Sequence, residues 1–153
     1  GEKCAFVESL GADGVIDLGK SELRAAVQEL TDGRGVDLVF DPVGGDLFAD
    51  AVRSLAWNGR LLVVGFAAGE IPRIAVNRTL LKSISIAGVA YGMSAIRDPA
   101  MNAENFRWLF DAYERGALRP RIDRRFAFED TALALRHVRD RRVMGKVIIE
   151  FGD

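Results

Sequence analysis

The stretch from Gly33 to Phe66 constrains the fold more than any other, because two apolar segments flank one amphipathic segment. Val36 to Phe40 is a nearly continuous apolar run, which is typical of a strand buried on both faces of a parallel sheet. Pro42 and the two glycines that follow end this run, since proline donates no ladder hydrogen bond and glycine permits positive φ. The stretch therefore begins as a strand followed by a tight turn.

A helix and a second strand are expected after this turn. Apolar residues recur at helical spacing up to Leu55, and Asn58-Gly59 closes the helix because both residues tolerate the left-handed conformation. A second apolar strand runs from Leu61 to Val64, so a right-handed βαβ crossover is the economical interpretation. Ligands on such sheets bind beyond the carboxyl ends of the strands, which here are Asp41–Gly45 and Gly65–Gly69.

Helices and strands alternate along the rest of the chain. The sequence predicts helices over residues 2–10, 22–32, 98–115 and 128–139, and further strands over 15–16, 83–89, 124–126 and 146–151. Polar and apolar residues alternate in the segment from Ser83 to Val89, which is typical of a strand near a sheet edge. This pattern predicts an α/β fold with a doubly wound, mainly parallel half-sheet.

Composition and charge narrow the class of protein. The 153 residues are 49% hydrophobic with a formal net charge of −1, so we expect a globular chain with a substantial core and no nucleic-acid partner. No apolar run reaches the roughly 20 residues needed to span a bilayer, and the first residues lack signal-peptide character. We therefore expect no membrane partner and a cytoplasmic location, although the chain opens with Gly1 rather than Met.

The chain has one cysteine, Cys4, and one histidine, His137. Together they cannot form a structural zinc site, which typically takes four Cys or His ligands, so we expect no metal site. Cys4 lies in an apolar helical context, which favours a buried, inert thiol over a reactive one. His137 lies among arginines on a late helix, where a solvated or helix-end histidine is favoured over a catalytic base.

Four segments, in this order and spacing, resemble one family. They are LGADGVIDLGK (Leu10–Lys20), GRGVDLVFDPVGGDLF (Gly33–Phe48), NGRLLVVGFAAGEIP (Asn58–Pro72) and DRRVMGKVIIEF (Asp140–Phe151). Together they resemble the C-terminal half of a medium-chain dehydrogenase/reductase, specifically of the NADPH:quinone oxidoreductase branch. The GroES-like catalytic domain and the glycine-rich pyrophosphate loop of that family have no counterpart here. The resemblance implies a partial Rossmann-type doubly wound parallel sheet.

This resemblance also implies a domain organisation and an activity. Residues 1–118 would be the second part of the nucleotide-binding domain, and 119–153 a segment that packs on the catalytic domain. A complete family member transfers hydride from NADPH to a quinone or an activated alkene or carbonyl, chemistry that belongs mostly to the cofactor. We expect NADP as cofactor, a truncated chain that is inactive alone, and a homodimer through the strand at Ser83–Gly88. The sequence leaves open whether this chain is itself an enzyme.

Two basic residues match cofactor contacts of the family. Lys3 matches a lysine that contacts the 2′-phosphate of NADPH, although the tyrosine often found near that phosphate corresponds to Leu18. The alternative for Lys3 is an exposed lysine at a helix start. Arg142 matches a C-terminal arginine that reaches the cofactor in some relatives. A solvated basic face formed by the arginines from Arg136 to Arg142 is equally compatible with the sequence.

Further cofactor contacts are implied after the strands. Val43 falls where family members contact the adenosine side or the middle of the cofactor. Gly65-Phe66-Ala67 matches the loop that passes the nicotinamide, and Val89-Ala90 follows the strand whose backbone meets the carboxamide. The alternative at each position is an ordinary turn or strand end.

No catalytic residue is predicted. Asp41 follows a strand and Asp46 stands at a helix N-cap, and both positions have ordinary structural roles. A non-enzymatic module that dimerises through an edge strand is a second hypothesis. An unrelated flavodoxin-like or methyltransferase-like nucleotide binder is a third hypothesis. The chain contains no G-x-G-x-x-G, P-loop or G-x-S-x-G motif, so no motif by itself identifies the chemistry or tests this alternative.

Overall fold

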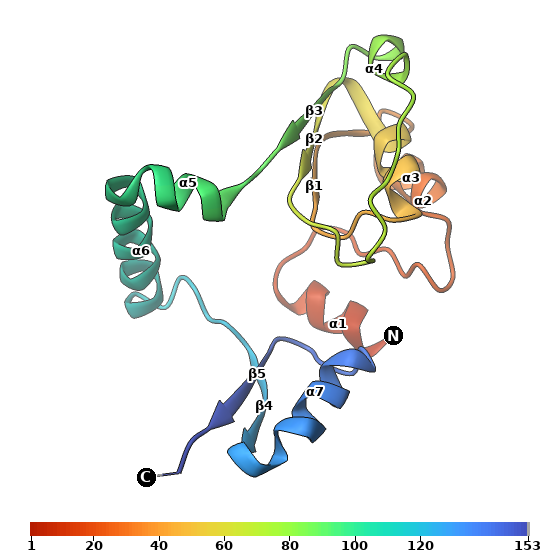
Figure 1. Cartoon of the computed structure of the whole chain (residues 1–153). Helices are drawn as coiled ribbons and strands as arrows, with labels where there is room; N and C mark the ends of the chain where they lie inside the picture. The colour runs from red at the N-terminus through yellow and green to blue at the C-terminus, as the bar shows by residue number, and fades with distance from the viewer. Residues whose placement is uncertain (153) are drawn as a thin grey trace. The chain divides into compact units, whose positions relative to one another are not determined.

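The computed structural model in Figure 1 describes residues 1–152 and combines helices with strands. In chain order the elements are α1 (Glu2–Ser9), α2 (Leu23–Leu30), β1 (Val36–Asp41), α3 (Leu47–Ser54), β2 (Leu55–Val63), α4 (Arg78–Leu81), β3 (Ser85–Gly88), α5 (Tyr91–Arg97), α6 (Pro99–Glu114), β4 (Ile122–Ala127), the 3₁₀ helix η1 (Phe128–Asp130), α7 (Thr131–Arg139) and β5 (Lys146–Glu150). The chain divides into unit 1 (Gly1–Met93) and unit 2 (Ser94–Asp153).

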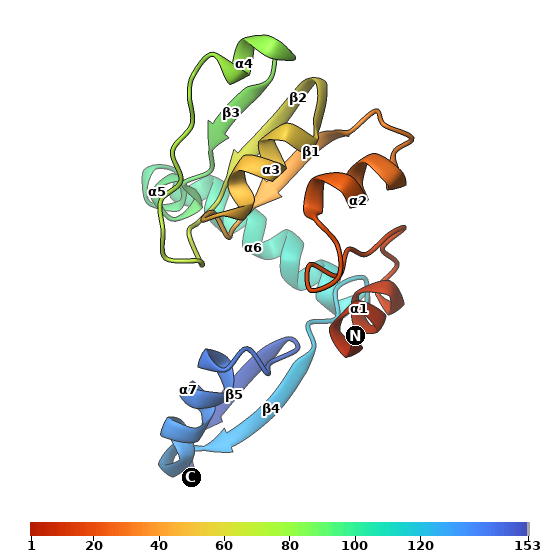
Figure 2. The same ribbon diagram turned by 90° about the vertical axis from the view of Figure 1, so that its right-hand side faces the viewer.

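Unit 1 is built on a three-stranded parallel sheet in the order β1-β2-β3. Val39 of β1 lies opposite Leu61 of β2, and Leu61 lies opposite Ile86 of β3. Figure 2 shows α2 and α3 side by side on one face of this sheet. The predicted α/β class and the parallel βαβ crossover are confirmed, and β3 is an edge strand of the described sheet, as expected.

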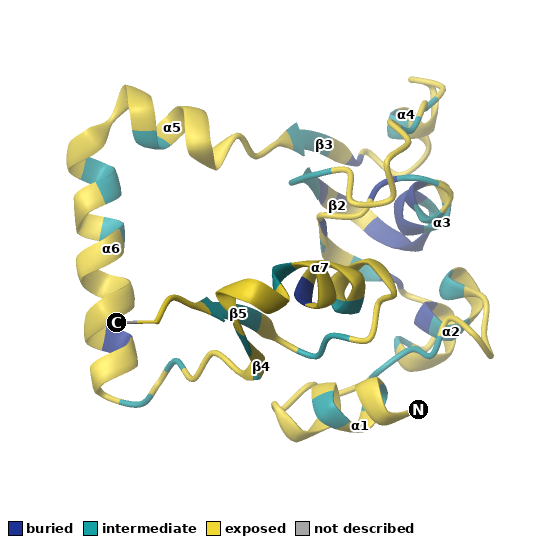
Figure 3. Ribbon diagram, turned by 60° about the horizontal axis from the view of Figure 1, so that its bottom comes forward, coloured by how far each residue is buried: buried dark blue, intermediate teal, exposed yellow. Residues whose placement is uncertain are grey.

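The core of unit 1 lies between α3 and the sheet. Apolar residues three and four apart on α3, Phe48, Ala51 and Val52, are buried against Leu55 and Leu61 of β2, both of which are 0% exposed. Burying a side chain of this size fully stabilises a fold by about 1.5–3 kcal/mol, so this cluster dominates the stability of the unit. The dark-blue ribbon of α3 and β2 in Figure 3 marks the same region.

Burial of β1 on both faces was a wrong prediction. Val36 and Val39 pack against the core, but Leu38 and Phe40 remain 56% and 64% exposed. From Leu38 to Asp41 successive side chains alternate between the two faces of the strand, and α2 and α3 cover only one face. The irregular pairing between Val36 and Leu38 interrupts this alternation, so Val36 and Val39 both pack against the core.

Asn58-Gly59 does not close α3, which was also a wrong prediction. β2 begins at Leu55 directly after the helix, and Asn58 (φ +60°) lies within the strand. Val36 pairs with Leu55 but Leu38 pairs with Arg60, so the pairing of β1 with β2 is irregular between these positions. Asn58, with its left-handed backbone, lies within this irregular part of β2.

One smaller prediction near the start of the chain is wrong. Val15 and Ile16 form no strand in the described structure, because no neighbouring strand lies alongside to complete a ladder. α2 begins after Glu22 without a side-chain cap. The helix ends at Leu30, and Gly33 beyond it has a φ of +80° and donates its N–H to the carbonyl of Gln28 at 2.7 Å.

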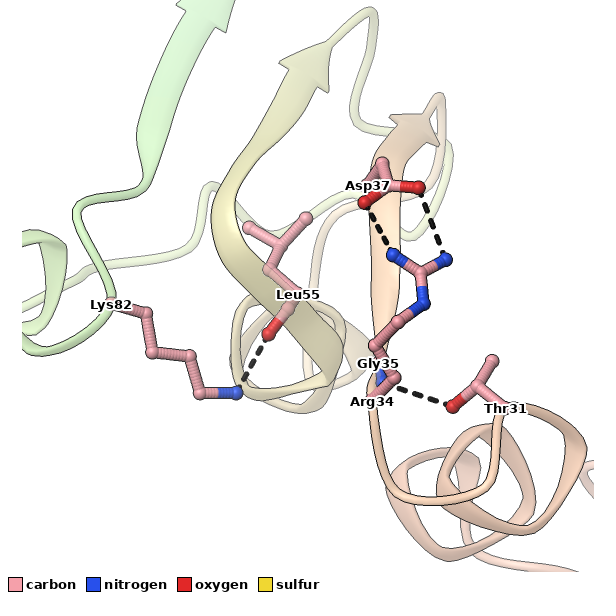
Figure 4. Close-up of polar contacts among 6 residues, drawn as sticks. All are labelled: Thr31, Arg34, Gly35, Asp37, Leu55 and Lys82. Carbon is pink, nitrogen blue, oxygen red and sulfur yellow. Dashed lines mark hydrogen bonds and ion pairs between the residues drawn. The ribbon is translucent and has the colours of Figure 1, made fainter.

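Polar contacts lie at the amino ends of the three strands (Figure 4). The Lys82 ammonium, just before β3, donates to the carbonyls of Leu55 at 2.6 Å and Arg53 at 2.9 Å. Ahead of β1, the Gly35 N–H donates to the Thr31 hydroxyl at 2.9 Å. A Cβ at Gly35, where φ is +82°, would lie 2.5 Å from the carbonyl oxygen of Ser54, so only glycine fits.

Unit 2 contains α6 and a second, smaller parallel sheet. The Asp98 carboxylate accepts a hydrogen bond from the Met101 N–H at 2.9 Å and Pro99 follows it, which confirms the predicted start of α6. β4 pairs with β5, and α7 packs on both strands. The preceding helix α5 was not predicted, since no capping residue marks its beginning. No helix within residues 1–152 is both long and apolar enough to cross a membrane.

Candidate functional site

The carboxyl ends of β1, β2 and β3 lie at one edge of the sheet, because neighbouring parallel strands run in the same direction. Each strand is followed there by a short segment: residues 41–45, 64–69 and 89–90. We call these three segments the carboxyl-edge loops. They contain Val43, the Gly65-Phe66-Ala67 turn and Val89-Ala90, so the sheet brings these predicted positions together.

Backbone hydrogen bonds hold the carboxyl-edge loops to one another. The Val64 N–H donates to the Asp41 carbonyl at 2.9 Å, and the Ala68 N–H donates to the Val43 carbonyl at 2.9 Å. On the other side of β2, the Val89 N–H donates to the Val63 carbonyl at 2.9 Å. The edge is therefore a connected backbone surface, although its segments are far apart in the sequence.

Asp41 organises the turn after β1. Its side chain is buried, and one carboxylate oxygen accepts hydrogen bonds from the N–H groups of Val43 and Gly44, each at 2.9 Å. This geometry agrees with the structural role expected for Asp41. Asp46 occupies the N-cap of α3, as expected, but its side chain makes no capping hydrogen bond.

Glycine is required where the first two loops meet. Gly44 and Gly45 have φ values of +65° and +61°. A Cβ at Gly45 would lie 2.7 Å from the Cβ of Ala68, and one at Gly44 would lie 3.0 Å from the ring of Phe66. Any side chain at these positions would push the loops apart.

Partly exposed apolar side chains lie on the carboxyl-edge loops. Val43, Phe66 and Val89 are 37%, 41% and 37% exposed, although each is of a type that proteins usually bury. They leave apolar surface exposed at this edge of the sheet.

Lys3 and Arg142 lie outside the carboxyl-edge loops. Lys3 is an exposed residue of α1. Arg142 belongs to unit 2, in the segment between α7 and β5. Lys3 is therefore outside the three loops of unit 1, and Arg142 belongs to the other unit. Cys4, on the same helix as Lys3, is half-buried, so the expectation of a buried thiol was wrong.

A hydrogen-bonded pair of side chains in unit 2 was missed by the sequence analysis. Nε2 of His137 on α7 lies 2.6 Å from a carboxylate oxygen of Asp123 on β4, and both side chains are nearly buried, at 12% and 11% exposed. The hydrogen bond from this ring lowers the pKa of Asp123 below its usual value. His137 does stand at a helix end, but it is not solvated. The sequence carries no signal for this pairing, since β4 and α7 are separate elements.

Metal binding finds no support in the described side chains. Across residues 1–152 there is no cluster of three or more His, Cys, Asp or Glu side chains that could hold an ion. The donors present therefore do not fit a zinc site, which needs three or four such ligands.

Comparison with known proteins adds evidence of common descent. The profile of the family described as zinc-binding dehydrogenase matches residues 10–149. A quinone oxidoreductase-like protein 2 homolog from Nematostella vectensis is 35% identical over 149 residues, which cover 97% of this chain and 41% of that protein. A quinone oxidoreductase from Pseudomonas aeruginosa is 30% identical over 151 residues, which cover 97% of this chain and 46% of that protein.

Solved structures of related oxidoreductases are also similar to this chain. A mycobacterial protein crystallised as a complex with NADPH is 28% identical, with a TM-score of 0.85 over 97% of this chain and 46% of that chain. A quinone oxidoreductase from Pseudomonas syringae is 28% identical, with a TM-score of 0.82 and the same coverage. The chain thus spans less than half the length of the proteins it matches.

Proposed function

Because the chain belongs to the zinc-binding dehydrogenase family, we propose that it forms part of the NADPH site of a quinone oxidoreductase-like protein. The observation that carries this proposal is that three loops with partly exposed apolar side chains, two of them containing glycine, lie at the carboxyl edge of a parallel sheet, where ligands of such sheets bind. Family membership also replaces the hypothesis of an unrelated flavodoxin-like or methyltransferase-like nucleotide binder.

The proposed roles follow the positions of the residues. The side chains of Val43 and Phe66 would pack against the cofactor, and the backbone of Val89-Ala90 would face the carboxamide. The ammonium of Lys3 and the guanidinium of Arg142 would each neutralise part of the charge of the cofactor. When bound, NADPH supplies a hydride, and these residues would orient it toward a quinone or enone substrate.

The proposal assigns different roles to two parts of the chain. Residues 1–118 would be the second part of the nucleotide-binding domain, and residues 119–153 would pack on a catalytic domain. No residue of this chain is proposed as a general acid, a general base or a zinc ligand, although zinc gives the family its name.

Titration calorimetry of the folded chain with NADPH and NADH tests the proposal. We expect saturable binding that favours NADPH, because only NADPH carries the 2′-phosphate assigned to Lys3. Phe66→Ala is expected to weaken binding of both cofactors. Lys3→Gln is expected to weaken only NADPH, and Lys20→Gln, on an exposed lysine of the same unit, should change neither. A folded chain that binds neither cofactor would contradict the proposal.

A second function, a module that dimerises without catalysis, rests on the edge position of β3. Its neighbour in the described sheet is β2 alone, so one side of the strand is available for pairing. We propose that β3 pairs with β3 of a second copy about a twofold axis. Light scattering should give the mass of a dimer for the original chain and of a monomer for Ile86→Lys. A monomer in both cases would refute this pairing.

A further inference from the structure

A pocket of about 330 Å³ lies on unit 2. None of its lining residues belongs to the carboxyl-edge loops. It is formed by β4, α7 and the segment that follows α7, and we call it the arginine pocket. Its lining residues are Arg124, Phe126, Leu133, Arg136, His137, Asp140 and Arg142. Three of these seven side chains are permanent cations.

Positive charge in the arginine pocket is not neutralised from within. Arg124, Arg136 and Arg142 take part in no ion pair or hydrogen bond of their side chains within residues 1–152. The one carboxylate of the lining, Asp140, is paired with the guanidinium of Arg139 at 2.8 Å. With three guanidinium groups and one carboxylate, the lining has a formal charge of +2 from these side chains.

The walls of the pocket are held in place. The near-buried pair of His137 with Asp123 fixes the imidazole ring, and the ring of Phe126 lies 6.2 Å from it, tilted by 52°. Leu133 completes the apolar part of the lining. Arg124 on β4 and Arg136 on α7 thus project from elements that are joined by a charge-assisted hydrogen bond.

The segment after α7 returns Arg142 to the pocket. The Arg142 N–H donates to the His137 carbonyl at 3.2 Å, and the Asp140 N–H donates to the Arg136 carbonyl at 2.9 Å. A helix C-terminus repels anions through its unsatisfied carbonyls, but here these hydrogen bonds occupy carbonyls of the last turn. Three guanidinium charges therefore outweigh the partial negative charge of the helix end.

We propose that the arginine pocket binds a phosphate dianion. Planar guanidinium groups bind phosphate oxygens in bidentate fashion, and a pocket of this volume holds a phosphate group with a small organic body. Both inorganic phosphate and a phosphate monoester of a nucleotide have this chemistry. The inference does not require the carboxyl-edge loops to bind a cofactor, and only Arg142 is shared with the function proposed above.

Proton NMR provides a direct test, because His137 is the only histidine and its ring resonances need no assignment. The full chain is titrated with sodium phosphate at constant pH and constant ionic strength, with chloride as the replaced anion. We expect a saturable shift of the His137 ring resonances. Arg124→Gln and Arg136→Gln should each weaken binding about tenfold, the effect of losing one charge-assisted hydrogen bond.

Arg107→Gln is the matched control, since Arg107 is an exposed arginine of α6 outside the pocket lining. Its affinity for phosphate should equal that of the original chain. A shift that grows linearly without saturation, or an equal loss of affinity in Arg107→Gln, would overturn the proposal.

Titration with adenosine 2′-phosphate and with adenosine distinguishes the two sources of the dianion. Tighter binding of adenosine 2′-phosphate than of inorganic phosphate would assign the pocket to a nucleotide monoester, and equal binding would assign it to the free ion. A His137 shift of the same size with adenosine alone would refute phosphate recognition. Cofactor binding at the carboxyl-edge loops is followed separately by nicotinamide fluorescence, so either proposal can fail without the other.

Discussion

Unit 1 and unit 2 both combine parallel strands with helices, yet they bury their apolar residues to very different extents. In unit 1 a cluster that includes Phe48, Leu55 and Leu61 is buried between α3 and the sheet. In the described part of unit 2, by contrast, the buried apolar residues are the small Ala112 and Ala134. Figure 3 shows this contrast as dark blue in α3 and β2 against mostly yellow α6 and α7. α7 does carry large apolar side chains, but Leu133, Leu135 and Val138 remain 49%, 66% and 48% exposed, so the two-stranded sheet of unit 2 has no comparable core within the described residues.

The apolar residues of α6 illustrate the difference. Phe106 and Phe110 lie one helical turn apart with ring centroids 6.2 Å apart, and they are 46% and 63% exposed. Charge differs as well: residues 1–93 contain nine basic and twelve acidic side chains, whereas residues 94–153 contain twelve basic and ten acidic ones. Unit 1 therefore offers apolar loops at a sheet edge, and unit 2 offers guanidinium groups.

Leu61→Ala should have the largest effect on the difference in stability between the two units, because it removes a fully buried side chain from the core of unit 1. We expect a loss of about 2–5 kcal/mol in the free energy of unfolding of unit 1. Hydrogen exchange followed by peptide mass spectrometry would locate the loss to β1, β2 and α3. Leu135→Ala is the control on α7, where the side chain is 66% exposed, and it should change stability by less than about 0.5 kcal/mol. Equal effects of the two substitutions would remove the distinction between the units.

Gly145→Ala should destabilise unit 2 alone. Gly145 has a φ of +119°, and a Cβ there would clash with the carbonyl of Arg121, which accepts the hydrogen bond that begins β5. Backbone strain of this kind costs about 1–3 kcal/mol. Exchange should accelerate in β4 and β5 and stay unchanged in β1 and β2. Gly152→Ala is the control, because a Cβ there meets no atom within 4 Å.

Lys82→Met tests how the amino ends of the strands hold unit 1 together. The substitution keeps the length of the side chain but removes its hydrogen bonds to the carbonyls of Arg53 and Leu55. Leaving these acceptors unpaired should cost about 1–3 kcal/mol, which urea denaturation would measure. Lys20→Met removes an exposed lysine whose ion pair with Asp17 is 3.8 Å long, so it should cost almost nothing. A similar cost for both variants would contradict a role of Lys82 in stability.

Asp123→Asn should give the smallest effect and a characteristic pH dependence in unit 2. The hydrogen bond from His137 lowers the pKa of Asp123 in the folded state below its usual value of 3.8. The carboxylate therefore stabilises the folded state above about pH 4, and this contribution is lost as the pH falls through the lowered pKa.

The expected result is a variant that is less stable near neutral pH and whose stability falls less steeply below about pH 4. Denaturation in urea at a series of pH values would measure it, with the His137 ring resonances as the reporter of unit 2. Asp111→Asn, which removes an exposed carboxylate of α6, should leave the pH profile unchanged. Identical acid profiles for Asp123→Asn and the original chain would show that the pair contributes no stability.

Local signals in the sequence accounted for much of the fold. The apolar run at Val36, the helix signals at Asp98-Pro99 and the final strand at Lys146 all correspond to observed elements. Predictions failed where a residue type serves two purposes: Asn58 tolerates a left-handed φ, but the structure uses it inside β2 and not at a helix end. Val15 and Ile16 have strand-like side chains, and yet a strand forms only beside a partner.

For the candidate site, too, some features could be predicted from the sequence and others could not. By itself the sequence determined the family, the parallel order of the central elements and the segments that follow Phe40 and Val64, because these depend on local pattern and on ordered motifs. Only the tertiary structure decided which residues meet: the hydrogen bonds between the carboxyl-edge loops, the pairing of His137 with Asp123 and the convergence of arginines around one pocket. Such contacts join residues that lie far apart along the chain, and no local propensity encodes the packing that brings them together.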